Sequence, residues 1–151
     1  FNVIKRFFNR QIRNFNESGC VGFIPAYKDS VEYVNKLYNN GWRFEVVSCL
    51  DKDKYAQGLR EKNLLHLFGN VFDFIDCSLD YTYGKYDYLF QRYSGKNHYW
   101  IEDSISHANS GKEIGLRSVI MDHEYNKEWK GLRVKNWKDV YWMVTNDDPT
   151  H

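Results

Sequence analysis

The fold is decided by residues 98–121, which read HYWIEDSISHANSGKEIGLRSVIM. This stretch opens with an aromatic and β-branched run, continues with a segment of helix-forming composition that ends at Gly115, and closes with a second apolar run. The alternation predicts a strand over 98–101, a helix over 104–114 and a strand over 117–121. Two strands joined by a helix form a right-handed unit with parallel strands. The stretch therefore predicts an α/β protein.

The same alternation extends to both sides of this unit. We expect further strands at 43–47 and 74–77, and further helices at 27–38, 52–67, 84–93 and 137–144. Residues 126–131 are predicted to be a loop. An apolar pattern at helical spacing over residues 1–15 predicts one more helix, which has no start signal before it. We therefore predict a three-layer α/β sandwich with a Rossmann-like parallel sheet, in which residues 1–19 form a helical segment and 20–151 the core.

The composition argues against several classes of function. The 21 Lys and Arg and the 20 Asp and Glu leave a formal net charge of +1, so a nucleic acid or an anionic membrane is not expected as the main partner. The three cysteines have no C-x-x-C spacing, which argues against a disulfide framework or a zinc site and favours a reducing compartment. No apolar run reaches the roughly 18 residues that a membrane helix needs. We expect a cytoplasmic protein with a small-molecule partner, and homo-oligomerisation stays open.

Polar side chains stand at the carboxyl ends of the predicted strands. Ser48 follows the strand over 43–47, and the pair Glu102 and Asp103 follows the strand over 98–101. In open parallel sheets, ligands bind at these ends. Two adjacent carboxylates repel each other unless a cation or hydrogen bonds compensate, which favours metal binding. The alternatives are that Ser48 only ends its strand and that Asp103 or Ser104 only caps the next helix.

Lys85 follows Gly84 at the predicted start of a helix. A helix begins with a partial positive charge, so the helix dipole does not favour a lysine there. A bound phosphate would account for Lys85, whereas a solvated surface lysine would need no ligand. The triplet Asp122-His123-Glu124 is interpreted as a polar loop, and the basic residues of the first helix as its solvated face.

Three short motifs, in this order, resemble motifs two, three and four of the haloacid-dehalogenase (HAD)-like superfamily. They are Val46-Val47-Ser48-Cys49, Gly84-Lys85 and Trp100-Ile101-Glu102-Asp103-Ser104, and the resemblance covers about residues 25–121. The ending Asn136-Trp137-Lys138-Asp139-Val140-Tyr141 is similar to that of small nucleotidase-like members, including phage-type 5'-deoxyribonucleotidases.

The resemblance implies a Mg²⁺-dependent phosphatase that forms an aspartyl-phosphate and acts on a small phosphorylated substrate such as a nucleotide. It implies that Ser48 and Lys85 are catalytic and that both bind the phosphate together with Cys49. It implies that Asp103, helped by Glu102, holds Mg²⁺, a hard cation that prefers carboxylate and water oxygens.

The family's first motif, an Asp-x-Asp that supplies the nucleophile, does not occur between Phe1 and Ser48. Its strand ordinarily lies between the strands of motifs two and four, so its absence would leave a gap in the sheet. We expect an upstream segment to carry it, which would make this chain an inactive, N-terminally truncated fragment with residues 1–19 as part of a small cap. The alternative is a non-catalytic domain that binds a phosphate-bearing ligand or a protein, with Val21–Ile24 or a partner chain filling the sheet. A nucleic-acid-binding protein is ranked last.

Overall fold

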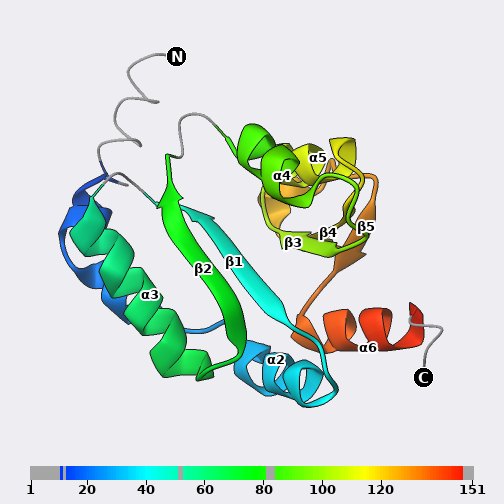
Figure 1. The fold of residues 1–151 in the computed structure, drawn as a ribbon, viewed down its shortest axis with the longest axis horizontal. Helices are drawn as coiled ribbons and strands as arrows, with labels where there is room; N and C mark the ends of the chain where they lie inside the picture. The colour runs from blue at the N-terminus through cyan, green and yellow to red at the C-terminus, as the bar shows by residue number, and fades with distance from the viewer. Residues whose placement is uncertain (1–10, 12, 51–52, 81–83, 148–151) are drawn as a thin grey trace. The chain divides into compact units, whose positions relative to one another are not determined.

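The computed structural model describes residues 11, 13–50, 53–80 and 84–147. Helices and strands alternate along them, and the described strands all pair in parallel (Figure 1). The elements are η1 (Cys20–Phe23), α2 (Ser30–Asn39), β1 (Phe44–Cys49), α3 (Lys54–Phe68), β2 (Phe72–Leu79), α4 (Tyr86–Tyr93), β3 (Tyr99–Glu102), α5 (Ile105–Glu113), β4 (Arg117–Met121), η2 (Glu124–Asn126), β5 (Leu132–Val134) and α6 (Trp137–Asp147). The predicted α/β class with parallel strands is confirmed.

The described strands form two sheets. β1 pairs with β2, with Val46 opposite Ile75, while β3, β4 and β5 form a second sheet in that order. A Rossmann-like sheet with a gap between the strands of motifs two and four was predicted, and among the described strands these two, β1 and β3, belong to different sheets. A central position in the second sheet explains why β4 is buried from Ser118 to Met121, since helices or loops cover both faces of such a strand.

The described residues fall into two compact units, and each is treated by itself. Unit 1 comprises the described residues of 1–27 and 34–83, and unit 2 comprises those of 28–33 and 84–151. The division into residues 1–19 and 20–151 stays a prediction. In unit 1, η1 packs against α3, and the buried residues Val21, Leu50 and Ala56 form a small core. Val21 was proposed above as part of a sheet-filling strand, but it lies in the 3-10 helix η1 and fills this core instead.

The core of unit 2 lies between α5 and the sheet. Ala108 of α5, Ile120 of β4 and Trp129 are buried against one another, with Ile105 packed beside them. Gly111 lets α5 lie close to strands β3 and β4. A side-chain carbon at this position would fall 2.8 Å from the Ser118 hydroxyl and closer still to the Trp100 ring. This close packing holds α5 against β3 and β4, and the candidate site residues Glu102 and Asp103 stand in the connection from β3 to α5.

Most predicted elements match within a few residues, and the strand over 117–121 matches β4 in both bounds. The loop predicted over 126–131 is confirmed from residue 127 on, while Asn126 ends the 3-10 helix η2, and the strand β5 that follows the loop was not predicted. A three-residue strand is too short to give a periodic signal. The first helix is described only in part: residues 13–17 are helical, and the rest of that prediction lies outside the described residues. Within the described parts of the chain, no helix is long and apolar enough to cross a membrane.

Candidate functional site

Unit 2 holds a buried ion pair between Lys85 and Glu102. Lys85 stands directly before α4 and Glu102 ends β3, and the Lys85 ammonium donates a hydrogen bond to Oε1 of Glu102. The two residues are only 6% and 8% exposed. The Lys85 Nζ also lies 5.0 Å from the centroid of the Trp100 ring, a distance that allows a cation–π contact. The ammonium is therefore fixed by a carboxylate and an aromatic face.

The second oxygen of Glu102 faces α5. The Nδ1 atom of His107 lies 3.7 Å from Oε2 of Glu102, and the Trp100 indole donates a hydrogen bond of 3.0 Å to the His107 carbonyl. Burial alone would raise the pKa of Glu102, but His107 and Lys85 together hold it below its ordinary value. Glu102 is thus charged at neutral pH, and both of its oxygens face protein partners.

Asp103 has a different environment from its neighbour. It is exposed, and its Oδ2 accepts a hydrogen bond of 2.6 Å from the Tyr125 hydroxyl. No protein partner of its Oδ1 is found in the part of the chain that the structure describes. Burial of the hydroxyl and this hydrogen bond raise the pKa of Tyr125, so the phenol stays a donor at neutral pH. The N-cap position of α5 belongs to Ser104, so helix capping does not account for the Asp103 carboxylate.

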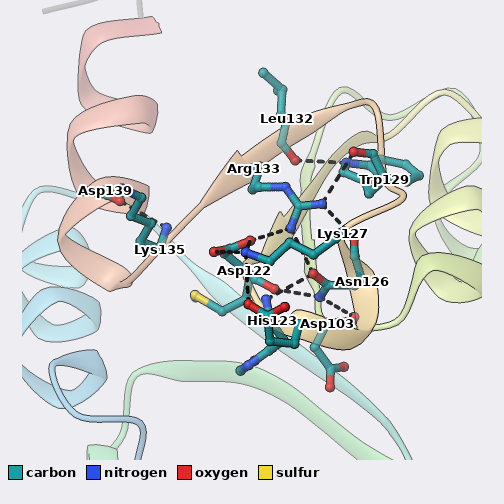
Figure 2. A network of polar contacts seen from close by, with 12 residues as sticks. Asp103, Asp122, His123, Asn126, Lys127, Trp129, Leu132, Arg133, Lys135 and Asp139 are labelled. Carbon is teal, nitrogen blue, oxygen red and sulfur yellow. Dashed lines mark hydrogen bonds and ion pairs between the residues drawn. The ribbon is translucent and has the colours of Figure 1, made fainter.

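A polar network joins the ends of β3 and β4, as Figure 2 shows. The side chain of Asn126, fully buried, donates hydrogen bonds of 2.8 Å to the carbonyl oxygens of Asp103 and Met121. Arg133 of β5 donates to the Asn126 side-chain oxygen at 2.8 Å and to its carbonyl at 2.6 Å. A further hydrogen bond from Arg133 lowers the pKa of Asp122, whose carboxylate therefore belongs to this network. The residues Tyr125, Asn126 and Arg133 were not predicted as site residues, because no sequence motif marks them.

The predicted site residues belong to both units. Lys85, Glu102 and Asp103 share unit 2, whereas Ser48 and Cys49 are half-buried residues of β1 in unit 1. The phosphate contacts predicted for Ser48 and Cys49 stay predictions.

Asp103 is better suited than Glu102 to hold a magnesium ion. Mg²⁺ is commonly bound by one or two carboxylates while it keeps several water ligands. The exposed Asp103 presents an oxygen without a described protein partner, whereas Glu102 is buried against Lys85 and His107. Among the described residues, no group of three or more His, Cys, Asp or Glu side chains is placed to hold a metal ion.

Comparison with known proteins gave no match to a family model, a curated protein or a solved structure.

Proposed function

We propose that this chain is a HAD-like phosphohydrolase domain that binds a small phosphate monoester, such as a nucleotide, together with Mg²⁺. The observation that carries the proposal is the arrangement at the carboxyl end of β3. There the fixed ammonium of Lys85 is paired with Glu102, and the exposed carboxylate of Asp103 comes next in the chain. Catalysis of phosphoryl transfer depends mainly on positioning and on stabilising the negative charge of the phosphoryl oxygens, which such groups can do.

Each residue has a distinct role in this proposal. Lys85 stabilises the charge of the phosphate, and Glu102 positions Lys85 by the buried ion pair. Asp103 holds Mg²⁺, which when bound would neutralise further phosphate charge. The Ser48 hydroxyl donates a hydrogen bond to a phosphate oxygen. Cys49 follows Ser48 in the proposed phosphate-binding segment. Glu102 is thereby assigned to the lysine rather than to the metal, because both of its oxygens already face protein groups.

The proposal also concerns the strand that is expected to carry the nucleophile. The HAD-like arrangement places a strand carrying the nucleophilic aspartate between the strands of motifs two and four. The strands that carry Ser48 and Glu102 are β1 and β3, and in the described residues they belong to separate sheets. The sequence between Phe1 and Ser48 contains no Asp-x-Asp. We therefore propose that the 151-residue chain binds phosphate esters without hydrolysing them.

The proposal can be tested by the ³¹P line width of a deoxynucleoside 5'-monophosphate titrated with the protein and Mg²⁺. Wild-type protein should broaden the signal, because exchange onto the protein shortens the relaxation time. Broadening should be lost in Asp103→Asn and in the double variant Lys85→Met/Glu102→Gln, which removes both buried charges at once. Lys127→Met, at an exposed lysine of the same unit, is the matched control and should behave as wild type. Equal broadening in all four proteins would contradict the proposal.

The second candidate is a non-catalytic domain that binds a phosphate-bearing ligand without metal. It keeps the phosphate-binding roles of Lys85 and Ser48 and drops the metal role of Asp103, and like the first candidate it needs no attacking carboxylate between Phe1 and Ser48. The same titration in the presence of a chelator separates the two candidates. Line broadening that persists without Mg²⁺ and is insensitive to Asp103→Asn would favour the binding domain.

A further inference from the structure

Two consecutive residues of η2 donate hydrogen bonds to Asp103 from their side chains, one to the Asp103 carboxylate and one to its backbone carbonyl. The Tyr125 hydroxyl donates to Oδ2 of the Asp103 carboxylate at 2.6 Å. The Asn126 side chain donates to the Asp103 carbonyl at 2.8 Å. The short segment η2 thus holds both the carboxylate and the backbone carbonyl of Asp103, the residue assigned to Mg²⁺.

This segment is itself held firmly in place. Asn126 is fully buried, and its amide also bonds the Met121 carbonyl at the end of β4. Its two oxygen atoms accept hydrogen bonds from Arg133 of β5. The Tyr125 ring stacks on the His123 ring with centroids 5.0 Å apart and an interplanar angle of 11°. The tyrosine is nevertheless 67% exposed, so the position of its hydroxyl is not explained by packing in a core.

We propose that Tyr125 is a positioning residue that orients the Asp103 carboxylate for a divalent cation. The inference rests on the proposed function in assigning Mg²⁺ to Asp103. The phenol donates to Oδ2 and restricts rotation of an exposed side chain, which leaves Oδ1 directed to solvent as the cation ligand. Hydrogen bonds to the carboxylates that hold a metal commonly orient the ligand in this way. Tyr125 itself does not touch the cation.

The test uses Mn²⁺ as the probe and the full chain. The concentration of free Mn²⁺ is followed by its EPR signal while protein is added. Tyr125→Phe removes only the hydroxyl and should weaken Mn²⁺ binding about tenfold, at the lower end of the effect that such outer contacts have on metal affinity. Tyr55→Phe is the matched control, since Tyr55 is also 67% exposed and lies in α3 of unit 1. It should leave the affinity unchanged, and both variants should keep the wild-type melting temperature.

Asp103→Asn separates failure of the inference from failure of the metal assignment. If Asp103→Asn abolishes Mn²⁺ binding while Tyr125→Phe binds as tightly as Tyr55→Phe, the positioning role is overturned and the proposed function stands. If wild type and Asp103→Asn bind Mn²⁺ equally, or neither binds it, Asp103 is not the cation ligand of this chain, and both the inference and the metal part of the proposed function are overturned.

Discussion

The ion pair of Lys85 and Glu102 is buried, so removal of one partner leaves the other charge in a site with little water. We predict that Lys85→Met lowers the free energy of unfolding by about 3–5 kcal/mol, the range for breaking a buried pair. The double variant Lys85→Met/Glu102→Gln should recover most of this loss, because no uncompensated charge remains. Urea denaturation followed by circular dichroism measures both changes.

An exposed ion pair of the same unit provides the control. Glu124 is 94% exposed where it contacts Lys127 at 3.5 Å, and Glu124→Gln should change the unfolding free energy by less than about 1 kcal/mol. If Lys85→Met lowered the unfolding free energy no more than Glu124→Gln does, the assignment of Lys85 and Glu102 as a buried pair that the fold requires would be contradicted.

The lowered pKa of Glu102 makes a second prediction, for the dependence of stability on pH. Because folding depresses this pKa below the ordinary value of 4.5, the ionised carboxylate contributes stability in full above that pH. The contribution is lost as the pH falls further, through the folded-state pKa. The difference in unfolding free energy between wild type and Glu102→Gln should therefore be constant near neutral pH and shrink below 4.5. Urea titrations at a series of pH values measure it, and a difference that does not shrink in acid would show that Glu102 is not held ionised by its partners.

At the scale of the element, two helical glycines should respond in opposite directions to the same substitution. Gly111 of α5 faces the Trp100 ring and the Ser118 hydroxyl, whereas a side-chain carbon at Gly58 of α3 would meet nothing within 4 Å. We predict that Gly111→Ala destabilises the protein by about 1–3 kcal/mol through overpacking. Gly58→Ala should stabilise it by about 0.5–1 kcal/mol, because alanine is the better helix former. Thermal and urea unfolding of the two variants give the signs directly, and a stabilising Gly111→Ala would show that α5 does not pack so closely on the sheet.

The elements differ in how well the sequence predicts them, and the reason is physical. β4 was predicted in both bounds because its β-branched and apolar residues Val119 to Met121 stand between the turn at Gly115 and the polar residue Asp122. β5 was missed because three residues carry no period, and its place depends on pairing with β4. Tyr125 and Asn126 were missed for a related reason, since their roles come from contacts with Asp103, which is distant in sequence. Lys85 and Glu102 were predicted as site residues, but their direct pairing was not.

For the whole molecule, the order of helices and strands follows from the sequence, while the extent of the sheets does not. Local patterns specify each helix and strand. They do not specify whether β1, which pairs with β2, also pairs with a further strand on its other side. The HAD-like resemblance predicts such a strand next to β1, and the described residues contain none there. In the HAD-like arrangement, the strand that would complete the sheet is also the one that would carry the attacking carboxylate, so the resemblance predicts that both are missing together.

This coincidence leads to a prediction for the activity of the 151-residue chain. In the proposed function, Lys85 stabilises the phosphate and Asp103 acts on it through a bound cation, and neither they nor Ser48 is assigned as the attacking carboxylate that forms an aspartyl-phosphate. We expect no Mg²⁺-dependent release of phosphate from p-nitrophenyl phosphate or from deoxynucleoside monophosphates above the rate without protein. The assay measures inorganic phosphate and includes Asp103→Asn, which removes the metal ligand. Turnover in wild type that is lost in Asp103→Asn would mean that another carboxylate of this chain serves as nucleophile, whereas turnover that survives in Asp103→Asn would contradict both the expected inactivity and the assignment of Asp103 to the metal.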